Sequence, residues 1–235
     1  MPDVEVTEFA FPSGSEQPLL VRPDGEAIAL LLYLHWFDEA PNANRTQFLD
    51  EATAMAEIGF VSLLPQLEFP WKSPPTGLPA DADRIRSQSK YLTRLVTSAR
   101  SHLAIDRLGI VGHDFGAMHG ARVARGLESR CNVFIAPTPR WSDWFLRFWP
   151  IDDDRYDYMR AMEPLDPLTA VGEIDAPTLY QFAKSDFYIA PMTGLELFGQ
   201  AKEPKTMIPY DADHSLDSAE AGSDRREFLQ KHLGG

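Results

Sequence analysis

The sequence predicts one α/β domain with a mostly parallel central sheet and helices on both faces. Short, continuous apolar runs are typical of strands buried on both faces, and here they alternate with amphipathic segments of helical period. The chain has 235 residues, of which 44% are hydrophobic, so it can bury one sizeable core. We therefore expect residues 1–235 to form a single domain.

The first half of the chain follows this alternation. Residues 4–11 alternate as an edge strand does, and residues 18–22 are expected to pair with them in a hairpin closed by the Pro-Asp-Gly turn at residues 23–25. The other expected elements are a central parallel strand at 27–34, a helix at 46–58, a buried strand at 60–64 and a long helix at 81–103.

The second half adds a segment that breaks the pattern. Residues 138–173 are rich in Trp, Phe and Tyr and have the length of a small helical lid inserted between two strands, with a few of the aromatic rings facing a pocket. The regular elements expected around it are an apolar strand from 107 followed by a helix to about 127, strands at 132–136, 177–182 and 205–208, and helices at 192–200 and 217–233.

Composition excludes several classes of function. A net charge of −13 and a pI near 4.8 argue against nucleic acid as a partner. The one cysteine, Cys131, lies in an apolar run and is expected to be a buried, inert thiol. The N-terminus lacks the apolar region of a signal peptide, and the longest apolar run is too short to span a bilayer, so we expect a cytoplasmic protein without a membrane partner.

The sequence also predicts that no metal or organic cofactor is needed. The acidic run at residues 152–154 cannot direct three consecutive side chains at one ion, which favours a solvated turn. We expect a small-molecule substrate and a monomer or homodimer.

Residues 112–116, Gly-His-Asp-Phe-Gly, form the most informative motif in the chain. They join an apolar strand to a helix, and this strand, tight turn and helix is the geometry of a nucleophile elbow. Glycines suit such a turn because the backbone segments approach closely. The residue at the tip is Asp114, a carboxylate where most elbows carry serine. The same motif could instead be a turn in which Asp114 caps the helix.

Two further polar residues follow strands at the same edge of the predicted sheet. Asp186 comes after the strand at 177–182, and His214 comes after the strand at 205–208. Ligands of such sheets bind outside the carboxyl ends of the strands. The chain order nucleophile, acid, histidine is that of the α/β-hydrolases. We therefore predict a catalytic triad of Asp114, Asp186 and His214.

Over nearly its full length the chain resembles the α/β-hydrolase superfamily. The run at 112–116 is similar to the Gly-His-Asp-(aromatic)-Gly elbow of haloalkane dehalogenases and epoxide hydrolases. The short chain, the compact lid and the close spacing of acid and histidine look more like the dienelactone hydrolase family, whose nucleophile is normally Cys or, in relatives, Ser.

The resemblance implies an oxyanion hole made of two backbone N–H groups. One belongs to the residue after the nucleophile, here Phe115. The other comes from a loop that reads His-Gly-x-Pro in dehalogenases and epoxide hydrolases, and residues 35–38 of this chain place Phe37 at the matching position without the glycine or proline. The residues expected to line the substrate pocket are His35, Trp36, Trp141, Trp144, Tyr156 and Tyr158. Epoxide hydrolases use two lid tyrosines as the acid, and Tyr156 and Tyr158 lie in the lid segment, but residues two apart do not share a helix face, which favours a packing role for at least one of them.

An aspartate at the elbow favours a particular chemistry. A carboxylate with an ordinary pKa of about 3.9 is already ionised at neutral pH and needs no base before it attacks. It is a poor nucleophile toward esters but can displace a halide or open an epoxide, leaving an ester on Asp114. His214, oriented by Asp186, would then activate the water that hydrolyses this ester.

Two alternatives remain open at this stage. In the first, the substrate is an ester or lactone and Asp114 acts as a base on water. In the second, the chain is a ligand-binding relative of hydrolases that has lost its Ser or Cys, although a binding protein has no evident need to keep Asp186 and His214.

Overall fold

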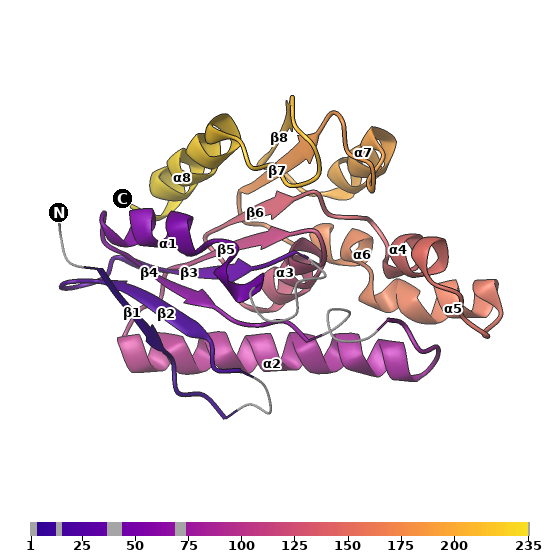
Figure 1. Cartoon of the computed structure of the whole chain (residues 1–235), viewed down its shortest axis with the longest axis horizontal. Coiled ribbons are helices and arrows are strands. Elements are labelled where there is room, and N and C mark those ends of the chain that lie inside the picture. Colours follow the sequence, from indigo (N-terminus) through magenta and orange to yellow (C-terminus); the bar gives the residue numbers. More distant parts are fainter. Residues whose placement is uncertain (1–3, 13–15, 37–43, 69–73, 235) are drawn as a thin grey trace.

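The sheet runs through the whole molecule and has eight strands in the order β1-β2-β4-β3-β5-β6-β7-β8. The computed structural model describes residues 4–12, 16–36, 44–68 and 74–234 (Figure 1). β1 and β2 are antiparallel to their neighbours and all later pairs are parallel, so the sheet is mostly parallel, as the sequence predicts. The strands are β1 (Val4–Glu8), β2 (Leu19–Pro23), β3 (Ala29–Leu34), β4 (Phe60–Leu64), β5 (Leu108–His113), β6 (Cys131–Ile135), β7 (Thr178–Ala183) and β8 (Lys205–Tyr210).

Helices cover both faces of this sheet, as expected. The helices are α1 (Leu49–Ala56), α2 (Ala80–Leu103), α3 (Phe115–Gly126), α4 (Trp141–Phe148), α5 (Arg155–Met162), α6 (Pro167–Val171), α7 (Pro191–Gln200) and α8 (Ala219–Leu233), with short 3₁₀ turns η1 (Asn44–Thr46) and η2 (Glu163–Leu165). In Figure 1, α1 and α8 lie on one side of the sheet and α2 lies on the other.

Alternate side chains of β3 build the two halves of the core. Leu31 and Tyr33 point into the cluster shared with α1 and α8, whereas Leu30, Leu32 and Leu34 point into the cluster shared with α2 and α3. This follows from the two-residue period of a strand, which sends successive side chains to opposite faces. β3 is fully buried, as a central strand covered on both faces must be.

Two sequence-based expectations about local structure are wrong. β1 and β2 do pair as a hairpin, but residues 9–18 connect them; the turn at 23–25 leads out of β2 because this strand also pairs with β4. The helix expected from residue 46 begins at Leu49, because residues 44–46 form the 3₁₀ turn.

The segment at 138–173 is helical and contains α4, α5, η2 and α6 between β6 and β7. α4 and α5 lie at one end of the molecule in Figure 1. Trp141 and Phe145 on α4 are completely buried in the core cluster. Part of the predicted lid is therefore core, and only one side of α4 remains for a pocket.

The structure also bears on the state of Cys131 and on whether a helix could span a membrane. Cys131 is buried, which raises the pKa of its thiol to about 12 and keeps it uncharged. Within the described ranges, the helices are too short or too polar to cross a membrane.

Candidate active site

Asp114 occupies a strained turn between β5 and α3. Its backbone has φ 52° and ψ −118°, a conformation that residues with a side chain rarely adopt. Its N–H donates to the carbonyl of Ile135 at 2.8 Å, and its own carbonyl accepts from Met118 at 3.0 Å. β6 and the first turn of α3 therefore hold the strained residue in place.

The two glycines of the motif are required by close backbone contacts. A Cβ atom at Gly112 would lie 2.6 Å from the Cα of Ala117, and one at Gly116 would collide with the carbonyl oxygens of Leu34 and His35. The tight turn thus packs against both its own helix and the end of β3. This geometry supports the interpretation of residues 112–116 as a nucleophile elbow.

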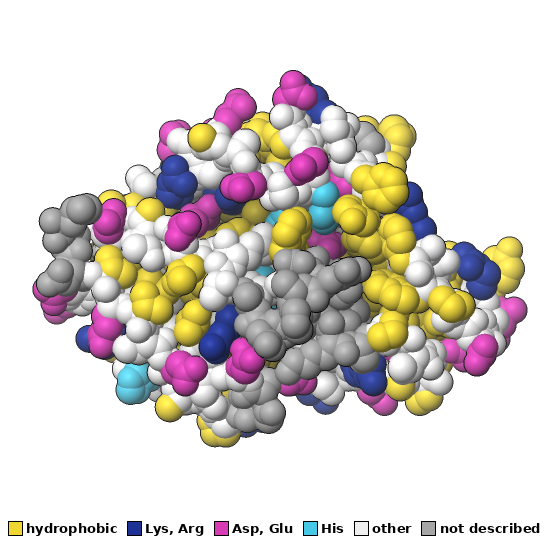
Figure 2. Space-filling model, in the orientation of Figure 1, with side chains coloured by type: hydrophobic (Ala, Val, Ile, Leu, Met, Phe, Trp, Pro, Cys, Tyr) yellow, Lys and Arg dark blue, Asp and Glu magenta, His cyan; other side chains and the backbone are white. Residues whose placement is uncertain are grey.

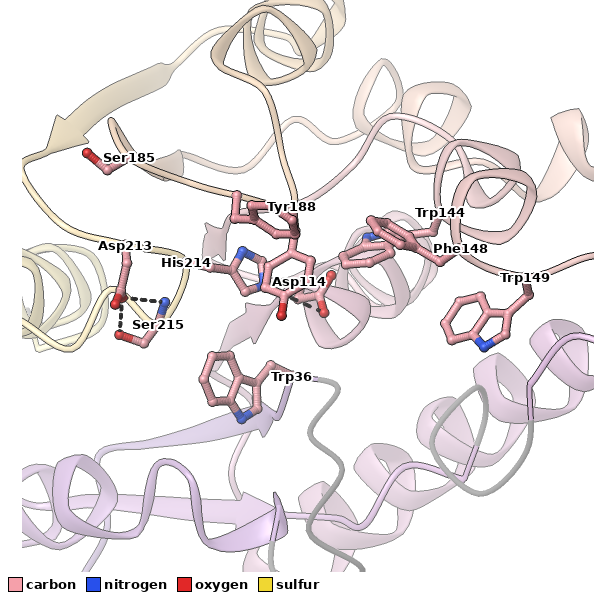
Figure 3. A pocket seen from close by; sticks show the side chains of 11 residues that line it. Trp36, Asp114, Trp144, Phe148, Trp149, Ser185, Tyr188, Asp213, His214 and Ser215 are labelled. Atoms are coloured by element: carbon pink, nitrogen blue, oxygen red, sulfur yellow. Dashed lines mark hydrogen bonds and ion pairs between the residues drawn. The ribbon is translucent and has the colours of Figure 1, made fainter.

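His214 lies beside Asp114 at the elbow (Figure 3), and the predicted acid, Asp186, contacts the other nitrogen of its ring. His214 Nε2 is 3.8 Å from Asp114 Oδ2, and His214 Nδ1 is 2.8 Å from Asp186 Oδ2. Asp186 is itself fixed, because its Oδ1 accepts the backbone N–H groups of Tyr188 and Ile189. The structure therefore brings the three residues together in the order carboxylate, imidazole, carboxylate.

The two carboxylates control the charge of His214. Burial alone would lower the pKa of the imidazole, but its contacts with Asp114 and Asp186, together with the charges of these two side chains, raise the pKa to about 9. At neutral pH the ring is therefore an imidazolium held between two carboxylates. A protonated imidazole at this position is not suited to act as the base that a serine nucleophile needs.

Behind His214 lies a second histidine that sequence reasoning missed. His113 Nε2 is 2.9 Å from the backbone carbonyl of His214, and its Nδ1 is 2.7 Å from Nε2 of Gln47. Gln47 Oε1 accepts the N–H of Trp36, and the Trp36 indole stacks on the His113 ring. The position of His113 inside the elbow motif was the available signal, but no sequence spacing pointed to Gln47.

A pocket of about 740 Å³ opens above Asp114 and His214. Its walls are largely aromatic, which suits an apolar ligand. The lining residues are Trp36, Asp114, Trp144, Phe148, Trp149, Ser185, Phe187, Tyr188, Asp213, His214 and Ser215, of which all but Phe187 are labelled in Figure 3.

Of the six pocket residues expected from the sequence, the structure places two in this lining: Trp36 and Trp144. Tyr156 is 77% exposed on α5 and lies outside the pocket. Tyr158 is buried, and its hydroxyl donates to Asp81 at 2.9 Å. The expectation that these two tyrosines flank the substrate is therefore wrong.

The remaining two expected residues are buried structural groups. The Trp141 indole donates to the carbonyl of Leu165 at 2.9 Å within the core. His35 is buried, and its Nε2 accepts the N–H of Leu67 at 2.8 Å. Both satisfy backbone groups far along the chain, which explains why local pattern misplaced them.

Phe115 and Phe37 are the two residues whose N–H groups are expected to form the oxyanion hole. Phe115 is the first residue of α3, so its N–H belongs to the end of the helix that stabilises negative charge. Its ring is buried against Trp141, Trp144 and Phe145. Phe37 lies outside the described residues.

Sequence reasoning also missed much of the aromatic wall. Phe148 and Trp149 end α4, and Tyr188 and Phe187 follow Asp186 directly. The latter pair could have been expected, because residues just after a parallel strand face the ligand edge of the sheet. In the part of the chain that is described, no group of three or more His, Cys, Asp or Glu side chains could hold a metal ion.

Solved structures with the same architecture identify the fold as that of the α/β-hydrolases. The esterase domain of a Rhodothermus marinus protein has a TM-score of 0.68 and 17% identity, with 99% of this chain and 100% of that chain covered. TT1662 from Thermus thermophilus has a TM-score of 0.72 and 16% identity, with 99% of each chain covered. The Pyrococcus furiosus esterase Pf2001 has a TM-score of 0.67 and 13% identity, with 99% and 92% covered.

Sequence comparison adds nothing to this assignment. No family model matches the chain, and no curated protein matches it. At the identities above, structural similarity establishes the fold, and the function has to be argued from the site itself.

Proposed function

We propose that this protein is a hydrolase that displaces a leaving group from a saturated carbon through a covalent ester on Asp114. The substrate would be an apolar halide or epoxide. The observation that carries the proposal is the carboxylate at the strained tip of the elbow, with His214 Nε2 3.8 Å from Asp114 Oδ2 and Asp186 on the other side of the imidazole. A protonated histidine cannot activate a serine or a water molecule, but an ionised Asp114 needs no activation.

In the first step an oxygen of Asp114 attacks the substrate carbon. The bond from carbon to the leaving group breaks, so a halide departs as an anion, or the ring oxygen of an epoxide leaves the attacked carbon as an alkoxide and takes a proton from solvent water. The negative charge on Asp114 disappears in the ester, and this removes one of the two charges that raise the pKa of His214. His214 therefore moves toward the neutral form that a general base requires.

In the second step His214 takes a proton from water as that water attacks the ester carbonyl. The Phe115 N–H stabilises the oxyanion. Collapse of the adduct breaks the bond between the carbonyl carbon and the alkoxy oxygen, and the alkoxide takes the proton from His214. Asp114 returns to its carboxylate form by releasing a proton to solvent.

Trp144 is suited to hold the leaving group. It is buried and lines the pocket, and its indole Nε1 has no hydrogen-bond partner within the described residues. Figure 3 shows the indole nitrogen on the side that faces Asp114. A buried donor without a partner is costly, so a ligand atom that accepts this hydrogen bond would be stabilised there.

Ester hydrolysis is the second candidate. Two of the structures compared above are named esterases and share the whole fold. In this case Asp114 would act as a base on water and no covalent intermediate would form.

A single turnover in ¹⁸O-labelled water distinguishes the two candidates. The covalent mechanism places the first label in the Asp114 carboxylate, because water attacks the enzyme ester and the product keeps an original aspartate oxygen. Peptide mass spectrometry would locate it. If the label from the first turnover is found only in the product, the covalent proposal is wrong and the base mechanism is favoured.

A further inference from the structure

The aromatic pocket borders a second cavity that carries two arginines. This cavity has a volume of about 350 Å³ and shares Phe148 and Trp149 with the pocket above Asp114. Its other walls include Leu146, Ile151, Arg147 and Arg155. We propose that it binds the anionic end of the substrate, so that the substrate is an apolar chain with the reacting carbon at one end and a carboxylate at the other. The identity of the reacting end rests on the proposed function above.

Both arginines are exposed, and each donates a hydrogen bond to a backbone carbonyl, which leaves its charge in place. Arg147 Nη1 donates to the carbonyl of Tyr188 at 3.0 Å, and Arg155 Nη1 donates to the carbonyl of Leu146 at 3.3 Å. For the described residues, neither arginine has an ion pair with a carboxylate, whereas the neighbouring Arg160 pairs with Asp157 at 3.2 Å. A guanidinium has five N–H donors, so each arginine retains donors that can reach an anion.

An apolar path joins the arginines to the reacting centre. The Arg147 guanidinium lies over the Phe148 ring, 5.1 Å from its centroid, and the Phe148 ring centroid is 4.5 Å from that of Trp144. Trp144 in turn lines the pocket with Asp114. Figure 3 shows Phe148 beside Trp144 near Asp114, and Trp149 farther from Asp114 on the same side of the pocket. Two aromatic side chains thus separate the carboxylate nucleophile from the cationic cavity.

The surface supports this orientation of the substrate. Figure 2 shows a band of hydrophobic side chains over α4 and α5 with Lys or Arg side chains at its edge. The protein as a whole carries a net charge of −13, which repels anions. A local pair of arginines beside an apolar cleft is therefore the feature that would let an anionic chain bind, and it would bind with its charged end away from Asp114.

The test compares a series of ω-bromoalkanoates of increasing chain length with the matching neutral amides. Arg147→Gln and Arg155→Gln should each lower kcat/KM for the optimal acid about threefold to tenfold, mainly through KM, as expected for partly exposed charged pairs. Neither substitution should change kcat/KM for the amides. Arg160→Gln is the matched control and should leave kcat/KM unchanged for both the acids and the amides. Equal losses for acid and amide, or a wild-type enzyme that prefers the amide at every chain length, would overturn the proposal.

A binding measurement separates this proposal from the catalytic one. Sodium decanoate and decanamide are unreactive probes, and tryptophan fluorescence reports their binding because Trp144 and Trp149 line the pocket. Decanoate should bind the wild-type protein more tightly than decanamide, and the double arginine variant should abolish the difference. Should this hold while no halide or epoxide is turned over, the anion site stands and the proposed reaction fails. Equal binding of the two probes, or none, contradicts the anion site whatever the reaction.

Discussion

His113 donates a hydrogen bond from Nε2 to the backbone carbonyl of His214 over 2.9 Å. The direction of this bond follows from its other partner: Gln47 uses its Oε1 as an acceptor for Trp36 and so presents Nε2 to His113 Nδ1. Burial, followed by the charge of His214, holds the pKa of His113 well below its ordinary value, so the ring is neutral. The last residue of β5 therefore positions the loop that carries His214.

Removing the hydrogen bond between His113 and His214 should slow hydrolysis of the Asp114 ester more than its formation. We expect His113→Phe to fold and to lower the rate of ester hydrolysis about 10-fold to 100-fold, because His214 must be placed accurately to deprotonate water. Formation of the Asp114 ester should change much less, since it does not need His214 as a base. Rapid-quench single-turnover kinetics would measure both rates, with the exposed His102→Phe as control. Equal slowing of the two steps would show that His113 merely supports the fold.

The glycines of the elbow provide a stability test. Gly116→Ala should lower the free energy of unfolding by at least about 2 kcal/mol, because its Cβ would collide with the backbone of Leu34. Gly126→Ala, at the end of the same helix, has open space around the added atom and should be neutral or stabilising by up to about 1 kcal/mol. Urea denaturation would compare the two variants. Similar losses at both positions would contradict the close contact at the turn.

The ion pairs of His214 predict a dependence of stability on pH. Its pKa is about 9 in the folded protein against an ordinary 6.5, so the stabilisation is fully present below pH 6.5 and is lost as pH rises through about 9. Asp114→Asn removes one of the two carboxylates, so the pKa of His214 should fall. The variant should therefore lose less stability than the wild-type protein as the pH rises through this range. The measurement is the free energy of unfolding across this window for both proteins. Parallel curves would mean that Asp114 does not stabilise the imidazolium.

The indole of Trp144 predicts a selective effect on the first step. Trp144→Phe keeps an aromatic ring against Phe115 and Phe148 but removes the buried N–H. We expect the rate of Asp114 ester formation to fall about 10-fold to 100-fold, equivalent to about 1.4–2.7 kcal/mol, with hydrolysis of the ester unchanged. The matched control is Trp149→Phe, which alters the same pocket farther from Asp114. An equal effect of both substitutions would show that the pocket needs bulk and not the N–H.

The sequence was sufficient to predict the succession of most strands and helices along the chain and the meeting of Asp114, Asp186 and His214. Both rest on rules that act along the chain: apolar runs form buried strands, and the residues that follow parallel strands gather at one edge of the sheet. The elbow was predictable for the same reason, since its glycines and its strained tip lie within five consecutive residues.

The pocket could not be predicted in this way. Whether an aromatic side chain faces a ligand or the core depends on partners that are remote in sequence. The Tyr158 hydroxyl donates a hydrogen bond to Asp81, and the Trp141 indole donates one to the carbonyl of Leu165, so both side chains lie outside the pocket. The neighbouring Trp144 has no such partner among the described residues and stays at the pocket. Helical periodicity alone does not distinguish these three positions.

The most direct test of the central claim is intact-protein mass spectrometry of the His214→Ala variant after brief exposure to a panel of haloalkanes, epoxides and aryl esters. Without its base the variant should still form the Asp114 ester but should be unable to hydrolyse it. The account predicts a mass increase equal to the alkyl group of a halide less one hydrogen, or to the whole mass of an epoxide, mapped to the peptide that contains Asp114 and absent from Asp114→Asn. A variant that gains no mass from any compound, while the wild-type enzyme hydrolyses an ester, would contradict covalent catalysis by Asp114.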